Sequence, residues 1–253
     1  AVGVKTTLIE RRPRILEFLD DEIAEALQFH MRSAGIRLRL GESVSEINLE
    51  DDQGHARLGS GKRLSSACLL DVAGRQGATA SLHLDRAGLT TDDRGRRTVN
   101  DCYQTQVPHI YAAGDVIGFP SLASTSMEQG RLATCHAFEL DCTSRPQCFP
   151  YGIYAIPEIS MVGKSESELT RANIPYEVGI AHYREIARGQ LIGDHSGMLK
   201  LLFHQETRKL LGVHILGEGA TELVHIGQAV LAFGGTVDYF IENVFNYPTL
   251  AEA

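Results

Sequence analysis

A glycine followed by an aspartate, Gly114 and Asp115, is the pair of residues in this sequence best placed to do chemistry. The apolar run 110–113 before it has the length of a buried strand. A glycine at a strand end lets a ligand approach the backbone, and a carboxylate beside it can accept a hydrogen bond from a ligand hydroxyl. The pair therefore indicates a cofactor contact. The alternative is a turn that only ends the strand.

The residues after this pair predict a helix that faces the same place. Ser121 is a candidate N-cap, and the helix is expected over residues 122–137. The first amides of a helix have no acceptor within it, and the helix dipole is positive at this end. Together with Asp115, these amides would form a cradle for a cofactor.

A second group that could bind a nucleotide lies near the first residues. The strand expected over 2–9 ends at Glu10, and Arg11 and Arg12 follow directly. In a βαβ nucleotide-binding unit, a carboxylate at this point accepts the ribose hydroxyls of the adenosine, whereas arginines suit a 2′-phosphate. This corner can therefore accept NAD or NADP, or it is only an exposed charge cluster. The G-x-G-x-x-G fingerprint that should precede such a strand is absent from the sequence.

The elements that would position these groups follow a mixed α/β order. Asp20 is expected to cap a helix that Gly35 ends. Alternating and apolar runs then predict strands at 36–40, 43–48, 55–58, 62–65 and 68–73. The last of these leads into Gly74 and Arg75.

The final hundred residues form a separate predicted module, with its boundary at 143–150. Ser165 and Glu168 have capping-box spacing, and a hairpin is expected over 198–204 and 209–216. A helix over 220–233 follows, and its expected apolar stripe consists of Leu223, Ile226, Val230 and Phe233. His225 on this helix is a possible catalytic group, although a lone histidine on an amphipathic helix is more often structural.

The composition narrows the classes of function. The 32 acidic residues outnumber the 24 basic ones, giving a net charge of −8, and nucleic-acid binding needs clustered positive charge. No apolar run approaches the ~18 residues that span a bilayer, and no signal-peptide pattern is present. We therefore expect a cytoplasmic protein with neither a nucleic-acid partner nor a membrane segment. The five cysteines form no Cys-x-x-Cys pair, which favours reduced thiols and no metal site.

The central motif consists of three runs: Tyr111-Ala112-Ala113-Gly114-Asp115-Val116, Leu122-Ala123 and Glu128-Gln129-Gly130. It resembles the second FAD motif of the two-dinucleotide-binding flavoprotein reductases, which include dihydrolipoamide dehydrogenase and glutathione reductase. The resemblance implies that Asp115 bonds a ribityl hydroxyl of FAD and that the backbone at Leu122 and Ala123 meets the flavin ring. It also implies that Gly74 and Arg75 close the nicotinamide-binding domain, although the Pro-Asn that usually follows this pair is missing here.

The resemblance implies an α/β fold in three parts. Residues 1–80 would be part of a Rossmann-like NAD(P)-binding domain without its first strand and glycine loop, and 81–148 the C-terminal part of an FAD-binding domain. Residues 149–253 would be an α+β interface domain that forms a homodimer. Because the sequence opens directly on a strand and stops at what looks like a helix start, we expect a piece of a longer protein.

The segment around Tyr247 decides the expected reaction. In the disulfide reductases of this family a histidine precedes the proline at this place, and a glutamate five residues later orients it for proton transfer. Here the two positions hold Tyr247 and Glu252, and a phenol, whose ordinary pKa is near 10, is a poor base for dithiol chemistry.

Three further runs resemble the family members that pass hydride from NADPH through FAD to NAD: 120–124, 175–179 and 245–249. That hydride transfer is the expected activity of the intact protein, and the fragment alone is expected to be inactive. Two alternatives stay open: a flavin disulfide reductase like dihydrolipoamide dehydrogenase, and a non-catalytic fragment that only dimerises.

Overall fold

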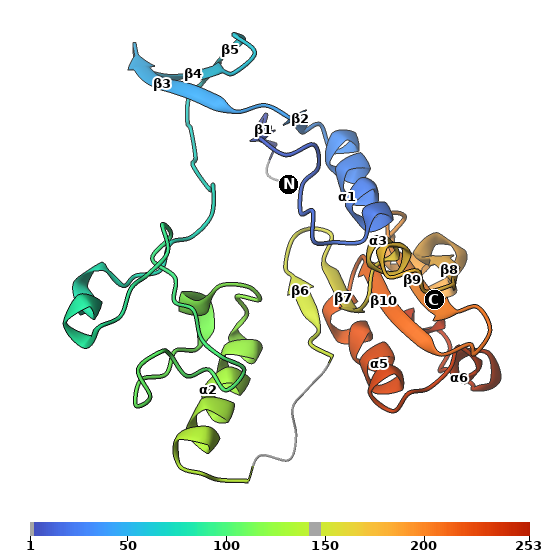
Figure 1. Cartoon of the computed structure of the whole chain (residues 1–253). Coiled ribbons are helices and arrows are strands. Elements are labelled where there is room, and N and C mark those ends of the chain that lie inside the picture. Colours follow the sequence, from blue (N-terminus) through green and yellow to red (C-terminus); the bar gives the residue numbers. More distant parts are fainter. Residues whose placement is uncertain (1–2, 142–147) are drawn as a thin grey trace. The chain divides into compact units, whose positions relative to one another are not determined.

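The computed structural model describes residues 3–141 and 148–253, and its chain divides into two compact units. The first unit combines residues 1–69 with 148–253, and the second covers 70–147. Figure 1 shows the elements along the chain. The predicted module boundary at 143–150 falls largely outside the described residues.

The first unit begins with two parallel strands joined by a helix. β1 (Thr7–Glu10) pairs in parallel with β2 (Arg37–Leu40), and α1 (Asp21–Ser33) connects them. The Asp20 carboxylate accepts the amide N–H of Glu22 at 3.2 Å, which confirms Asp20 as the helix cap. This βαβ unit is the expected piece of an α/β nucleotide-binding fold.

An antiparallel meander of three strands follows, as predicted: β3 (Val44–Glu50), β4 (Gln53–Leu58) and β5 (Arg63–Ser66). Asp51 and Asp52 form the turn between β3 and β4 with φ values of 50° and 57°. Aspartate tolerates this left-handed conformation better than most residues because its short side chain can bond locally.

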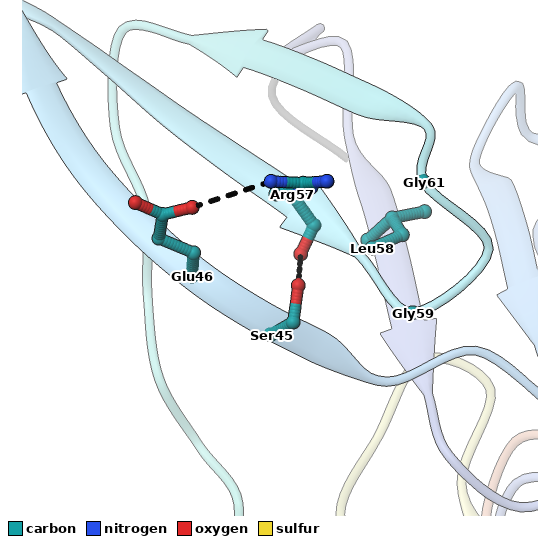
Figure 2. A pocket seen from close by; sticks show the side chains of 6 residues that line it. All are labelled: Ser45, Glu46, Arg57, Leu58, Gly59 and Gly61. Atoms are coloured by element: carbon teal, nitrogen blue, oxygen red, sulfur yellow. Dashed lines mark hydrogen bonds and ion pairs between the residues drawn. The ribbon is translucent and has the colours of Figure 1, made fainter.

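A hollow on the surface of this meander offers little chemistry. Figure 2 shows it beside Glu46 and Arg57, whose charged atoms lie 4.0 Å apart, while Ser45 Oγ donates to the Arg57 carbonyl at 3.0 Å. Leu58, Gly59 and Gly61 complete the lining. The charged groups pair with each other and are exposed, so the hollow is not a candidate site.

The strand predicted over 68–73 does not form, and this expectation was wrong. Residues 68–73 are irregular, and the side chains of Leu70 and Val72 are 81% and 78% exposed. An apolar strand is stable only when neighbouring strands accept its backbone bonds. The parallel sheet of the described residues contains only β1 and β2, and neither pairs with this segment.

The C-terminal part of the first unit is an antiparallel five-stranded sheet in the order β6-β7-β10-β9-β8. Its strands are β6 (Tyr151–Ile153), β7 (Ile159–Gly163), β8 (Tyr176–His182), β9 (Met198–His204) and β10 (Leu210–Leu216). Its helices are α3 (Glu166–Arg171), α4 (Ala187–Ile192), α5 (Ala220–Ala232) and α6 (Asp238–Glu242). The predicted β9–β10 hairpin and the Ser165 capping box are both present.

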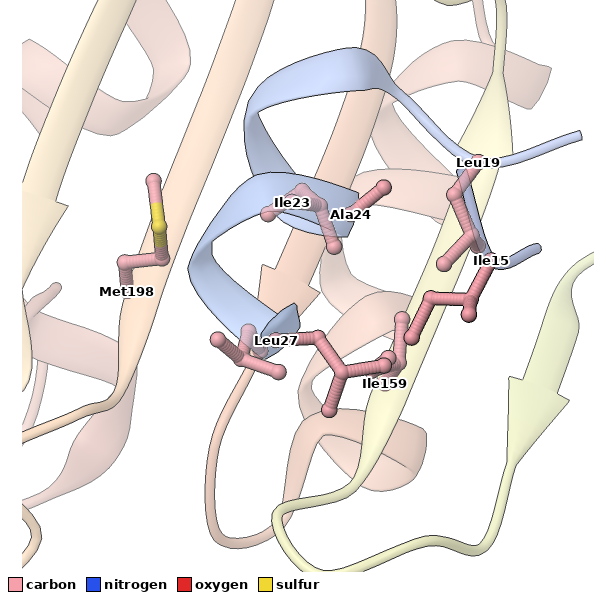
Figure 3. Close-up of a cluster of buried hydrophobic side chains, with 8 residues drawn as sticks. Ile15, Leu19, Ile23, Ala24, Leu27, Ile159 and Met198 are labelled. Atoms are coloured by element: carbon pink, nitrogen blue, oxygen red, sulfur yellow. The ribbon is translucent and has the colours of Figure 1, made fainter. Parts of the chain in front are cut away.

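This sheet carries a helix on each face. On one face α1 buries Ile23, Ala24 and Leu27 against Ile159 and Met198, a cluster that Figure 3 shows in close-up. On the other face α5 packs against Val162, Val213 and Ile215, whose side chains point to the opposite side of the same sheet. The βαβ piece and the sheet therefore share one hydrophobic core.

The buried stripe of α5 differs from the predicted one. The residues that face the sheet are Ala220, Val224, Gly227 and Val230, whereas Phe233 is 92% exposed. A Cβ at Gly227 would lie 2.5 Å from Val213 Cγ2, so the helix approaches the sheet along its small residues. Val230 of the predicted stripe is buried and Leu223 packs against the same cluster, so hydrophobicity alone predicts this face only in part.

The second unit consists mainly of turns around α2 (Ala123–Ala137), with short 3-10 turns at η1 (Ala80–Leu82), η2 (Leu84–Ala87) and η3 (Gly114–Ile117). The strand expected at 110–113 reduces to one isolated bridge between Tyr111 and Gln104. Among the described residues, no neighbouring strand is present to extend it.

Two local expectations in this unit are corrected. Ser121 Oγ donates to the Gly118 carbonyl at 3.0 Å, so Ser121 does not cap α2, whose N-cap is Leu122. Cys135 is disulfide-bonded, against the expectation of reduced thiols, whereas Cys68 and Cys148 carry free thiols.

Candidate functional site

Gly114 and Asp115 open the 3-10 turn η3 in the second unit. The Gly114 amide donates to Gln129 Oε1 of α2 at 2.7 Å in a buried setting. Gly114 has a φ of 83°, and a Cβ there would lie 3.2 Å from Ser126 Oγ. The backbone conformation thus favours glycine, and the close approach of Ser126 on α2 leaves little room for a Cβ. The turn holds Asp115 half-exposed beside the helix.

Arg75 is the cationic partner of Asp115. Its Nη1 lies 2.8 Å from Asp115 Oδ2, and the two side chains are 85% and 46% exposed. The sequence assigns these residues to two different nucleotides. The structure brings them together, and Gly74 lies in the same compact unit with a φ of 114°.

The first turn of α2 is open at its N-terminus. Its N-cap, Leu122, makes no side-chain hydrogen bond to the first amides, which include that of Ala123. Uncapped amides at a helix start are donors for a ligand. With the accepting carboxylate of Asp115, this donor set fits a polyhydroxylated, anionic cofactor such as FAD.

The predicted ribose corner, Glu10 with Arg11 and Arg12, lies at the end of β1 in the first unit. Glu10 Oε1 accepts the Arg12 amide at 2.9 Å, and Arg12 Nε lies 3.7 Å from Glu17. Arg11 is exposed and forms no ion pair with any residue that the structure describes. Arg12 is therefore engaged in holding the turn, and Arg11 is the arginine available for a ligand.

The C-terminal segment presents Tyr247 to solvent, 74% exposed. Glu252 Oε2 accepts the Thr249 amide at 3.1 Å in a capping box. Glu252 therefore caps the last turn. Among the described residues, no hydrogen bond or ion pair joins Tyr247 or Glu252 to the Glu10 corner. His225 on α5 is exposed, and its Nδ1 lies 2.8 Å from Gln228 Oε1.

A buried ionic cluster was missed from the sequence. Lys200 of β9 has a fully buried side chain whose Nζ meets Asp20 at 2.8 Å and Glu22 at 3.0 Å, and it also contacts Glu166 of α3. The signal was available, because alternation along β9 places position 200 on the buried face with Met198 and Leu202.

The charges of this cluster stabilise one another. Burial alone would raise the pKa of Asp20 and lower that of Lys200, but the hydrogen bonds between them hold the pKa of Asp20 below, and that of Lys200 above, its ordinary value. Burial lowers the pKa of His214, the cross-strand neighbour of Lys200. The three carboxylates lie close enough to hold a metal ion, but the Lys200 ammonium already lies among them as their cation.

Comparison with known proteins identifies the family. The sequence profile described as pyridine nucleotide-disulphide oxidoreductase matches residues 1–130, and the profile of that family's dimerisation domain matches residues 149–253. The chain belongs to the pyridine nucleotide-disulphide oxidoreductase family. The expected α/β fold and the resemblance on which it was based are thereby confirmed.

Curated relatives align with this chain along its whole length. The soluble pyridine nucleotide transhydrogenase of Mycobacterium tuberculosis is 53% identical over 253 residues, which are 100% of this chain and 54% of that protein. The protein of the same name from Colwellia psychrerythraea is 48% identical over 258 residues, 100% of this chain and 55% of that protein. The chain thus spans about half the length of the curated relatives it matches.

A solved structure shares the fold of this chain. The HOCl-induced flavoprotein disulfide reductase RclA from Escherichia coli aligns with a TM-score of 0.90 at 26% identity, covering 99% of this chain and 58% of that one. Within the described residues, no helix is both long and apolar enough to cross a membrane.

Proposed function

We propose that the whole protein to which this chain belongs is an FAD-dependent oxidoreductase that transfers hydride between NADPH and NAD, a soluble pyridine nucleotide transhydrogenase. The observation that carries the proposal is the 53% identity, over every residue of the chain, to proteins of that name. A cytoplasmic location fits their description as soluble.

The residues around Asp115 would hold the FAD. Asp115 would accept a ribityl hydroxyl, and the backbone at Leu122 and Ala123 would face the flavin ring; the Leu122 amide itself donates to the Pro120 carbonyl at 2.9 Å, so the Ala123 amide is the uncapped one. The chemistry that FAD supplies when bound is reversible hydride acceptance. The task of these residues is to orient the cofactor, and Gly114 and Gln129 fix their geometry.

The ribose corner would take both nicotinamide substrates. Glu10 presents a carboxylate suited to the free ribose hydroxyls of NAD, and Arg11 presents a guanidinium suited to the 2′-phosphate of NADP. A reaction between the two nucleotides needs a corner that accepts either. The sequence predicts that Gly74 closes the nicotinamide-binding domain, and we propose the same role for it in the whole protein.

Tyr247 and Glu252 support hydride transfer over dithiol exchange. A thiol substrate needs a group that takes and returns protons, and the exposed Tyr247 has no carboxylate partner among the described residues. Hydride transfer between two nicotinamides needs no such base. We propose that Tyr247 lines the reaction site and that Glu252 shapes the turn that presents it.

Residues 149–253 would form a homodimer, as their match to a dimerisation domain supports. The apolar side chains of Phe233 and Val244 are 92% and 98% exposed in this module. Exposed apolar groups of this size are typical of a surface that a partner covers.

The decisive test is an activity assay on the full-length protein. We expect a yellow protein that reduces a thionicotinamide analogue of NAD with NADPH, seen as new absorbance of the reduced analogue, and that turns over neither lipoamide nor glutathione. The likeness to RclA, a flavoprotein disulfide reductase, favours the alternative of dithiol chemistry. Dithiol turnover without transhydrogenation would establish that alternative, and a full-length protein without flavin would leave only a dimerisation role.

A further inference from the structure

We propose that Arg75 is a positioning residue of the flavin site, which holds the Asp115 carboxylate in the orientation that accepts the ribityl hydroxyl. The inference rests on the proposed function, because it takes Asp115 as the FAD contact. The observation behind it is the 2.8 Å ion pair between Arg75 Nη1 and Asp115 Oδ2, across 40 positions of the sequence.

The backbone beside Arg75 is fixed by close packing. The Gly77 amide donates to the Arg94 carbonyl at 2.7 Å, and a Cβ at Gly77 would lie 2.2 Å from the Gly95 carbonyl oxygen. Thr79 is buried, and its hydroxyl donates to the same Gly95 carbonyl at 2.9 Å. The segment that carries Arg75 is thus anchored to the turn at 92–97.

The same turn is anchored to η3, the 3-10 turn that carries Asp115. The Arg97 amide donates to the Val116 carbonyl at 2.8 Å, and the Gly118 amide donates to the Asp115 carbonyl at 3.1 Å. η3, on which Asp115 lies, is also held to α2 by the bond from the Gly114 amide to Gln129 Oε1. Both members of the ion pair therefore project from one hydrogen-bonded frame, although their side chains are exposed.

The pair leaves half of the carboxylate for a ligand. Arg75 engages Oδ2, and no hydrogen bond from a described residue reaches Asp115 Oδ1. A carboxylate can accept at both oxygens, so one can hold the guanidinium while the other accepts a hydroxyl.

The test measures FAD affinity of the full-length protein by titrating the flavin-free form and following flavin fluorescence. Exposed ion pairs contribute up to about 1 kcal/mol, so Arg75→Gln should raise the FAD dissociation constant about fivefold. Arg75→Lys should restore most of the affinity, because a charge at this place suffices to hold Asp115. Arg86→Gln, at an exposed arginine of η2 in the same unit, is the matched control and should bind FAD as the wild type does.

Asp115→Asn separates the inference from the function on which it rests. We expect this variant to lose more affinity than Arg75→Gln, and the double variant to bind FAD no more weakly than Asp115→Asn alone. Additive losses, or an Arg75→Gln variant with wild-type FAD affinity and a raised KM for NADPH, would overturn the role of Arg75. Unchanged FAD binding by Asp115→Asn would instead overturn the proposed FAD contact. Circular dichroism of each flavin-free variant shows whether it is folded. If Arg75→Gln does not fold, Arg75→Lys takes its place in the comparison with Asp115→Asn.

Discussion

Single side chains in this chain accept backbone hydrogen bonds that neighbouring strands would accept in a complete sheet. The Gly114 amide finds its acceptor in the side chain of Gln129, so the motif keeps its turn without the strand expected before it. Similarly, Glu10 holds the ribose corner by accepting the Arg12 amide. The sequence allowed candidate motif residues to be named because their types carry the chemistry, and their roles stay predictions. Their partners could not be named, since Arg75 and Asp115 are 40 positions apart.

The two arginines after β1 predict different effects on nucleotide binding. Arg11→Gln in the full-length protein should raise the KM for NADPH about tenfold, the loss of one charge-assisted contact, and leave the KM for NAD nearly unchanged. Arg12→Gln should have a smaller effect, because Arg12 already pairs with Glu17. Steady-state kinetics with each nucleotide measure both. Equal effects of the two substitutions would show that Arg11 is not the 2′-phosphate contact.

At the scale of elements, α1 is attached to the sheet both by a core and by charge. Lys200→Met would leave the Asp20, Glu22 and Glu166 carboxylates facing one another without a cation. Breaking a buried pair costs roughly 3 kcal/mol or more, so hydrogen exchange of α1 and β9 should accelerate accordingly. Lys62→Met, at a lysine that is 61% exposed and 3.6 Å from Glu42, is the control and should change exchange little.

The same cluster predicts an acid dependence. Because Lys200 holds the pKa of Asp20 below its ordinary value of 3.8, the interaction stabilises the fold above about pH 4 and is lost as the pH falls through the lowered pKa. The melting temperatures of the wild type and Lys200→Met should therefore differ most near pH 7 and converge towards pH 3. A constant difference over that range would show that Asp20 does not titrate with the cluster.

Elements that carry their own signals were predictable, and those that need distant neighbours were not. Asp20 and Ser165 begin helices at the expected residues because a cap is a local bond. The segments at 68–73 and 110–113 are apolar enough for strands but lack a ladder among the described residues. The face of α5 was predicted only in part, at Leu223 and Val230, because close approach through Gly227 outweighs side-chain size.

At the scale of the whole molecule, the chain would supply one wall of the proposed flavin site. It spans 54% of its transhydrogenase relatives, and no glycine fingerprint is present in its sequence. The isolated 253-residue chain should therefore retain little FAD and show no turnover. An absorbance scan of the purified chain from roughly 350 to 500 nm, where flavins absorb, measures the FAD that it retains. Stoichiometric flavin would mean that Asp115 and α2 suffice for binding.

The packing of α1 on the interface sheet also limits how the protein can be recombined. A chimera joined at residue 149 would part Ile23 and Leu27 from Ile159 and Met198, and would strand the Lys200 ammonium without Asp20. An exchange of subunit specificity between relatives must therefore carry α1 together with the sheet. The unit that must be exchanged as a whole is residues 1–69 plus 148–253. These two stretches are separate in the sequence but pack into one compact unit.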